Sequence, residues 1–268
     1  MWLDNEHVVR IGAYACVLAA VGLAEILWPR RAAHVRRSRR WPGNLALAAL
    51  GTLLVRALLP MGLVSLAVGA AGHGWGLLNR IDLPAVVTIG GSIVVLDLVV
   101  YAQHVVFHKI PLLWRVHRMH HTDLHVDVTT GVRFHPVELA LSTVVKGAAV
   151  VLLGAPAGAV LAFEVLLNAT AMFNHGNVRL PRSLDRWLRA LIVVTPDMHR
   201  VHHSVDKTET DSNFGFNLPW WDRLFGTYRA VPALGHDGMQ IGLAEFRRPE
   251  DSRLDRLLLQ PFRRPGNR

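Results

Sequence analysis

The stretch YAQHVVFHKIPLLWRVHRMHH, from Tyr101 to His121, contains five histidines among twenty-one residues. It overlaps the end of an apolar run, Leu83 to Gln103, which is long enough to cross a membrane and carries one charge, Asp97. Neutral imidazole is a common metal ligand in proteins. The sequence therefore predicts a metal site at the end of a membrane helix.

The overall composition agrees with a membrane protein. The chain has 268 residues, of which 51% are hydrophobic, and a formal net charge of +9. Apolar runs joined by basic loops are typical of integral membrane proteins that face anionic lipid. The arginines flank the apolar runs and do not alternate with stacking aromatics, which argues against nucleic acid as a partner. The single cysteine, Cys16, excludes an internal disulfide and a metal site with several thiolates.

Three further apolar regions complete the predicted membrane part. Ile11 to Trp28, preceded by acidic residues, is interpreted as a retained membrane helix and not as a signal peptide, and a second run extends from about Leu45 to Val68. Val137 to Phe173 is split near Gly154 into two arms of about 16 residues, roughly 24 Å each as helix. The hydrocarbon core is about 30 Å thick. We therefore expect an all-α integral membrane protein with about three spanning helices and a helical hairpin that spans or dips and returns.

The arginines predict the orientation of these helices. Six arginines lie between Pro29 and Trp41, and basic loops are favoured on the cytoplasmic side. Alternation of the helices then brings every histidine group to that same face, which supports one shared site. We expect membrane helices in residues 1–82, a catalytic domain in residues 83–228 with a cytoplasmic histidine-rich part, and a cytoplasmic C-terminal tail in residues 229–268.

The histidines are spaced for metal binding. His104 and His108 are four residues apart, and the pattern HxxHH occurs twice, at His117, His120 and His121 and at His199, His202 and His203. Residues three and four apart share one helix face, so each group can direct two or three imidazoles towards one point. Pro111 precedes one HxxHH, and Thr195 and Pro196 precede the other, as expected at helix starts.

Eight grouped imidazoles exceed the four ligands of a single zinc site, so two metal ions fit better. Imidazole suits zinc, copper, iron and nickel. Asp97 and Tyr101 continue the helical stripe of His104 and His108, and a carboxylate at position 97 is placed to accept the remaining N–H of a ligating histidine.

The chain resembles the fatty acid hydroxylase and sterol desaturase superfamily. Within this superfamily it is most similar to the short bacterial proteins called sterol desaturase family proteins. The resemblance covers about Leu83 to Tyr228. Its segments are LDLVVYAQHVVFHKIPLLWRVHRMHH, RFHPVE, NHGN, TPDMHRVHHS and NFGFNLPWWDRLFGTY, in the order in which the family has them.

The resemblance implies a set of iron ligands. They are His104, His108, His117, His120, His121, His175, His199, His202 and His203. Some members carry a further histidine four residues before the one in NHGN, where this chain has Ala171. A tenth ligand is therefore in doubt, and a water held by Asn174 or Asn168 is one alternative. His135 is a reserve candidate, either as a ligand or as a hydrogen-bonding neighbour.

The implied activity is that of a membrane-bound non-haem di-iron oxidoreductase that uses O₂ and two electrons to hydroxylate a lipid C–H bond. A lipid desaturase with the same site is the alternative, and a histidine-rich membrane metal transporter or an inactive scaffold represents another class. The sequence contains no nucleotide-binding loop, so electrons are expected from a separate ferredoxin or similar reductase. Arginine greatly outnumbers lysine, which suggests a bacterial inner-membrane protein.

Overall fold

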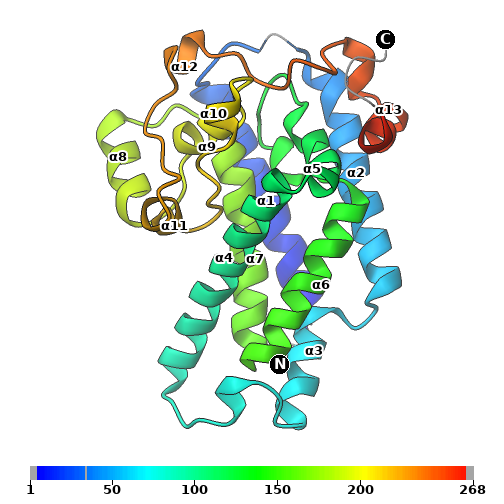
Figure 1. The fold of residues 1–268 in the computed structure, drawn as a ribbon, viewed down its shortest axis with the longest axis vertical. Helices are drawn as coiled ribbons and strands as arrows, with labels where there is room; N and C mark the ends of the chain where they lie inside the picture. Colours follow the sequence, from blue (N-terminus) through cyan, green and yellow to red (C-terminus); the bar gives the residue numbers. More distant parts are fainter. Residues whose placement is uncertain (1–4, 34, 264–268) are drawn as a thin grey trace.

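The computed structural model describes residues 5–33 and 35–263, and this part of the chain is helical without β-strands. Figure 1 shows a long helical bundle with a cap of short helices at one end. The bundle consists of α1 (Glu6–Leu27), α2 (Arg37–Leu58), α3 (Gly62–Gly72), α4 (Ala85–Lys109), α6 (Pro136–Leu153) and α7 (Ala157–His175). The cap contains α5 (Pro111–His121), α8 (Arg182–Leu191), α9 (Pro196–His202), α10 (Lys207–Thr210), α11 (Trp220–Leu224), α12 (Gly235–Gly238) and α13 (Leu254–Leu259).

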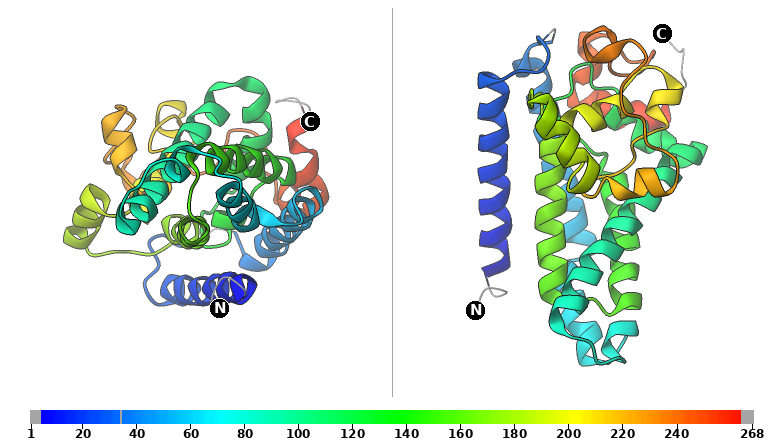
Figure 2. Two further views of the ribbon diagram at one scale, coloured as in Figure 1. Left: turned by 90° about the horizontal axis from the view of Figure 1, so that it is seen from below. Right: turned by 90° about the vertical axis from the view of Figure 1, so that its left-hand side faces the viewer.

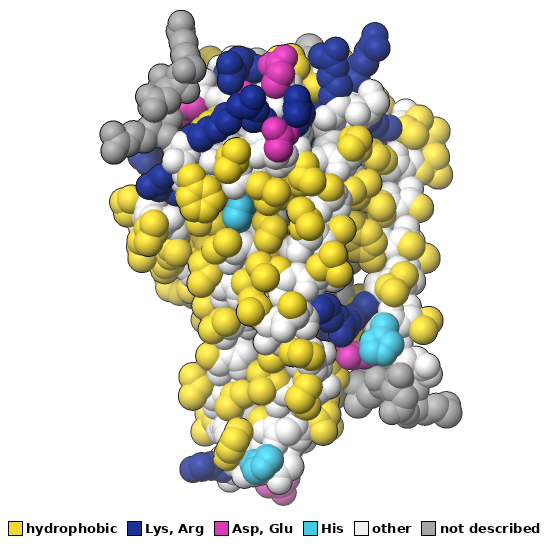
Figure 3. Space-filling model, turned by 90° about the vertical axis from the view of Figure 1, so that its right-hand side faces the viewer, with side chains coloured by type: hydrophobic (Ala, Val, Ile, Leu, Met, Phe, Trp, Pro, Cys, Tyr) yellow, Lys and Arg dark blue, Asp and Glu magenta, His cyan; other side chains and the backbone are white. Residues whose placement is uncertain are grey.

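Five segments of the described chain are long and apolar enough to cross a membrane. They are Glu6–Leu27, Arg37–Asn79, Ala85–Lys109, Pro136–Leu153 and Ala157–His175. The arms of the predicted hairpin are 18 and 19 residues long, slightly longer than expected, so both qualify as spans by length and composition. Many large apolar side chains of these five segments are exposed on the surface of the bundle. Figure 3 shows the resulting hydrophobic belt, with Lys, Arg, Asp and Glu side chains gathered above it. The all-α membrane fold predicted from the sequence is confirmed.

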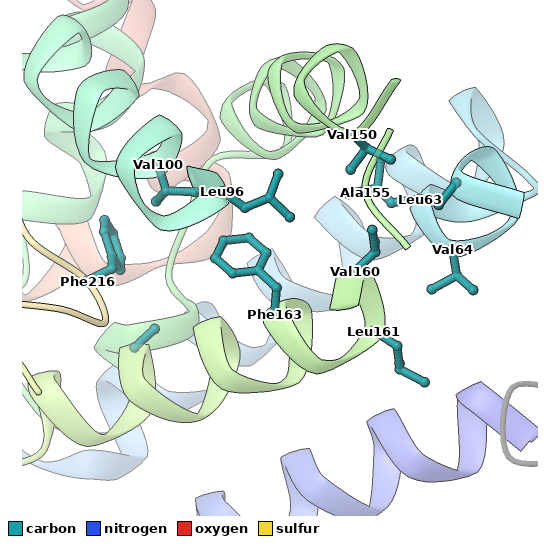
Figure 4. Packing of buried hydrophobic residues seen from close by; sticks show 12 residues of the cluster. Leu63, Val64, Leu96, Val100, Val150, Ala155, Val160, Leu161, Phe163 and Phe216 are labelled. Atoms are coloured by element: carbon teal, nitrogen blue, oxygen red, sulfur yellow. The ribbon is translucent and has the colours of Figure 1, made fainter. Parts of the chain in front are cut away.

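The core of the bundle lies between α3, α4, α6 and α7. Leu96 and Val100 of α4 pack with Phe163 of α7, Val150 of α6 and Leu63 of α3 (Figure 4). Helix α1 packs along α7 at the outside of the bundle (Figure 2). This arrangement leaves α4 and α7 side by side, and their C-terminal ends reach the cap together.

A glycine makes the connection between α6 and α7 possible. Gly154 ends α6 with a φ of +72°, a left-handed conformation that favours glycine. A Cβ atom at this position would lie 2.8 Å from the Nδ2 atom of Asn79. The turn that follows contains Pro156, after which α7 begins and returns to the cap.

Buried charges tie the arginine-rich segment to the cap. Arg40, near the start of α2, donates to Asp123 at 2.5 and 2.8 Å and to Asp127 at 2.7 Å. Arg133 donates to Asn44 of α2 at 2.9 Å. The arginine-rich segment therefore lies at the same end of the molecule as the histidine groups, as the alternation of helices predicted. Its cytoplasmic location stays a prediction.

Candidate metal centre

Two neighbouring groups of buried histidines lie at the junction of the bundle and the cap. The five-histidine group contains His104, His108, His117, His121 and His202. The four-histidine group contains His120, His175, His199 and His203. Within each group the candidate ligand atoms all lie within 4.8 Å of one another. The structure thus brings together all nine histidines that the sequence indicated.

The local sequence explains how four helices supply these side chains. His104 and His108 are one helical turn apart on the last turns of α4, and His175 is the last residue of α7. Pro111 begins α5, and Thr195 caps α9 by accepting from the backbone N–H of Met198. The predicted helix starts are therefore confirmed.

Each HxxHH pattern divides its histidines between the two groups. His117 and His121, four residues apart on α5, enter the five-histidine group, whereas His120 enters the other. The second pattern does the reverse, because His199 and His203 enter the four-histidine group and His202 enters the five-histidine group. Adjacent residues on a helix point about 100° apart. Two histidines of each pattern therefore point towards one group, as the spacing predicted, and the third points towards the other.

Imidazole rings of the two groups are in direct contact. The rings of His121 and His203, which belong to different groups, stack with their centroids 4.6 Å apart. The rings of His120 and His203, within one group, are 4.8 Å apart. Two metal ions bound in these groups would be near neighbours.

Hydrogen bonds orient most of the rings through their Nδ1 atoms. His104 faces the carbonyl oxygen of Phe214 at 2.7 Å, and His117 faces the Glu138 carboxylate at 2.6 Å. The Nδ1 atom of His108 faces the Asp211 carboxylate. The Nδ1 atoms of His120, His175 and His202 face the backbone carbonyl oxygens of Arg133, Ala171 and Ser212, respectively. An acceptor on Nδ1 leaves Nε2 free as a ligand and fixes the ring orientation.

The remaining nitrogen atoms fit a metal ion. The Nε2 atoms of His104 and His117 are 3.1 Å apart, and those of His120 and His175 are 3.0 Å apart. Two ligands at a right angle with metal–nitrogen bonds of about 2.1 Å would be about 3.0 Å apart. The buried Nε2 atoms of His108, His202 and His203 have no hydrogen-bond partner among the residues that the structure describes. Unsatisfied buried polar atoms are rare in proteins, and bound ions would satisfy them.

The environment keeps the cap histidines neutral. Burial lowers the pKa of His120, His121, His199 and His203 well below its usual value, and the neighbouring histidines lower it further. Burial and the nearby His117 lower the pKa of His202 to about 3. Only the neutral ring has a lone pair for a metal, so these residues are ready to bind one near pH 7.

Some additional residues indicated by the sequence have other contacts. Asp97 accepts from the backbone N–H groups of Asn217 and Leu218 and from the Trp221 indole, so its expected bond to a histidine is wrong. The Tyr101 hydroxyl contacts Thr227 at 2.9 Å. Both residues hold the segment after α9 against α4. They support the site indirectly because this segment provides the Phe214 carbonyl.

Two other candidates lie outside the ligand groups. His135 caps the start of α6, where its Nδ1 atom accepts from the Val137 backbone N–H, and it belongs to neither group. The side-chain nitrogen of Asn174 donates to the Phe216 carbonyl at 3.0 Å, while its buried Oδ1 atom has no partner in the described part of the chain. Asn174 therefore keeps one free acceptor next to His175. The four-histidine group contains no fifth imidazole from the described residues. This agrees with the presence of Ala171 at the position where some family members carry a further histidine.

Glu138 is the main residue that sequence analysis missed. It lies in the first turn of α6, where its carboxylate holds His117, and both side chains are buried. A carboxylate at the start of an apolar helix and within the RFHPVE segment was the available signal. Its partner could not be inferred, because Glu138 and His117 are on different helices.

A cavity of about 530 Å³ extends from the centre into the bundle. His104, His117 and Glu138 line one end of it. It is also lined by apolar side chains, including Leu59, just after α2, Phe107 of α4, Leu139 of α6 and Val165 of α7. Such a cavity suits a hydrocarbon chain that enters from the membrane.

The fold and site together define a helical membrane protein with two neighbouring groups of buried histidines that are arranged as metal ligands. A family model described as fatty acid hydroxylase matches residues 90–227, just over half of the chain. The chain therefore belongs to the fatty acid hydroxylase family. The matched part contains all nine histidines of the centre.

The proteins to which this chain is similar have names that describe lipid-modifying enzymes. The chain is 28% identical to ornithine lipid hydroxylase OlsE of Rhizobium tropici over 229 residues, which are 82% of this chain and 66% of that protein. It is 30% identical to alkylglycerol monooxygenase of Danio rerio over 132 residues, which are 49% of this chain and 28% of that protein. The chain thus spans less than two thirds of these relatives. No solved structure matches it significantly.

Proposed function

We propose that this protein is a membrane-bound, O₂-dependent hydroxylase of a lipid C–H bond, and that its nine grouped histidines hold two iron ions. The observation that carries the proposal is the position of two buried histidine groups at the end of a largely apolar cavity. Family membership favours iron over the other metals that imidazole binds. The two relatives are named as a lipid hydroxylase and an alkylglycerol monooxygenase, which supports this class of reaction.

The chemistry requires a protected site and an external electron source. When bound, the iron ions would supply the activation of O₂ that attack on an unactivated C–H bond requires. The balance is one lipid C–H bond, one O₂, two electrons and two protons, which give one C–OH bond and one water. We propose that a separate ferredoxin or similar reductase delivers the electrons.

The residues of this chain perform the positioning. Glu138, Asp211 and the backbone carbonyls orient the imidazoles, so that the ligands are arranged before the metal binds. Phe134, whose ring stacks on His120 at 4.5 Å, and Phe216 line the cavity beside the centre. These aromatic rings limit water and guide an apolar chain towards the histidines.

The remaining predictions about location and organisation follow this proposal. Residues 83–228 would form the catalytic domain, and the helices of residues 1–82 would complete the lipid cavity, since α1 and α2 line it. The centre would face the cytoplasm of a bacterium from its inner membrane, because the arginine-rich segment lies at the same end.

The experiment is comparative lipid mass spectrometry under ¹⁸O₂. Strains would carry the wild-type gene, His202→Ala or no gene, with iron content measured on the purified proteins. We expect one lipid to gain a single labelled oxygen only with the wild type. A lipid that instead loses two hydrogens would identify a desaturase. Identical lipids in all three strains, with iron bound and a donor present, would refute the oxygenase and favour a transporter or scaffold.

A further inference from the structure

The end of the cavity remote from the histidines is charged. Five acidic or basic side chains from α1, α2, α6 and α7 line it beside His7, and we call these five the charged end: Glu6, Arg10, Arg56, Lys146 and Glu164. All five belong to segments that are long and apolar enough to cross a membrane. Figure 3 shows basic and acidic side chains gathered within the otherwise hydrophobic belt. Ionisable groups within membrane-spanning segments are costly and are candidates for functional sites.

The carboxylates of the charged end are already paired. Arg10 donates to Glu164 at 2.7 Å and to Glu6 at 3.1 Å, so one guanidinium joins both acidic groups. These contacts also hold the start of α1 against α7. An anchoring role for α1 therefore explains three of the five residues.

The other two residues are cations without a partner. Neither Lys146 nor Arg56 forms a salt bridge within 4.0 Å or a side-chain hydrogen bond to any residue in the described part of the chain. Glu164 and Arg10 are the charged groups that influence Lys146, and one arginine already occupies that glutamate. The charged end has three basic and two acidic groups, so it presents an uncompensated positive charge to the cavity.

We propose that Lys146 and Arg56 bind an anionic group, a carboxylate or phosphate, of the lipid whose hydrocarbon part fills the cavity. This inference rests on the proposed function for the identity of the occupant as substrate. Two cations that line the same cavity and have no acceptor among the described residues match the oxygen atoms of such an anion. The site would thereby select acidic or zwitterionic lipids over neutral lipids such as sterols.

Helix geometry gives the approximate separation, along α6 and α7, between the charged end and the metal centre. Lys146 lies eight residues after Glu138 on α6, and Glu164 lies eleven residues before His175 on α7. At 1.5 Å per residue these separations are about 12 and 16 Å. With C–C bonds of about 1.5 Å, this is on the order of ten carbon atoms of extended chain. The reaction is therefore expected on the hydrocarbon, remote from the anion.

Binding of matched lipid pairs tests the inference without turnover. The iron-loaded full chain in neutral detergent would be equilibrated with stearate or methyl stearate, and with dioleoyl phosphatidylglycerol or dioleoylglycerol. We expect the wild type to retain the anionic member of at least one pair about tenfold better, as a charge-assisted hydrogen bond would provide. The pair that shows the preference distinguishes a carboxylate from a phosphate.

Variants locate the preference. Lys146→Met and Arg56→Met should each reduce the preference and together abolish it, whereas the exposed Arg80→Met, outside the cavity, should preserve it. Equal retention of charged and neutral lipids by the wild type would overturn the inference and leave only the anchoring of α1. A preference unchanged by the double variant would also overturn it. Failure of the proposed function would appear separately, as the absence of an ¹⁸O product despite selective binding.

Discussion

At the residue scale, the centre depends on side chains that bind no metal themselves. Glu138 accepts the Nδ1 proton of His117 at 2.6 Å, in a position where both side chains are almost completely buried. A carboxylate makes a stronger hydrogen bond than a neutral acceptor and raises the basicity of the opposite ring nitrogen. Glu138 is therefore a positioning residue for one ligand of the five-histidine group.

Replacement of Glu138 should weaken metal binding. We expect Glu138→Ala to lower iron affinity about 10- to 100-fold, and Glu138→Gln to lower it less because the amide oxygen still accepts. Chelator competition on the purified protein measures this change. Glu250→Ala, at an exposed position with no side-chain hydrogen bond or salt bridge to the described residues, is the matched control. An unchanged affinity in Glu138→Ala would show that His117 needs no carboxylate.

At the element scale, two short helices each serve both metal groups. α5 gives two histidines to the five-histidine group and one to the other, whereas α9 with its C-cap residue His203 does the reverse. The exchange follows from the helical repeat, because residues four apart share a face and adjacent residues do not. Each helix therefore couples the two groups, and movement of either helix would disturb both.

Neighbouring histidines on α9 should have different effects on metal content. His202→Ala leaves four imidazoles in its group, whereas His203→Ala leaves three in the other. We expect His203→Ala to lose about one of two iron ions and His202→Ala to retain more iron, because about four ligands complete a stable site. Iron stoichiometry by mass spectrometry of metal content measures both. The same iron content in the two variants would contradict the assignment of these residues to separate groups.

At the scale of the whole molecule, buried ion pairs connect the membrane bundle to the cap. Arg40 of α2 is fully buried and bridges Asp123 and Asp127, which follow the candidate ligand His121. Asn44 and Thr130 donate to Asp123 in the same network. The nearby Arg40 and Arg133 guanidinium groups hold the pKa of the Asp123 carboxyl well below its usual range, despite its burial. The network determines how α2 meets the metal centre.

Loss of Arg40 should destabilise the entire protein. Arg40→Met would leave two buried carboxylates without their cation, which costs about 3–5 kcal/mol in comparable cases. We expect a clearly lower thermal unfolding temperature in detergent and reduced iron retention. Arg39→Met, at the exposed neighbouring position, is the control and should change little. Equal unfolding temperatures for the two variants would show that the bundle and cap do not depend on this network.

The sequence by itself determined the helices and the nine candidate ligands. Apolar runs, helix starts such as Pro111 and Thr195, and histidine spacing are local features, since they depend on residues within a few helical turns. The sequence also predicted that the C-terminal ends of α4 and α7 lie at the same end of the molecule as the arginine-rich segment. Successive membrane spans run in opposite directions, so the order of the spans determines the end at which each one stops. The division into three domains is a prediction that still needs a test.

Only the tertiary structure decided how these residues are combined. The division of each HxxHH pattern between two groups depends on where α5 and α9 lie relative to α4 and α7. The bond from Glu138 to His117 joins residues 21 positions apart, and the charged end joins side chains from four helices. Asp97 shows the converse, because it lies on the histidine stripe yet binds the segment after α9. Helix periodicity predicts a face, whereas packing between helices determines what that face contacts.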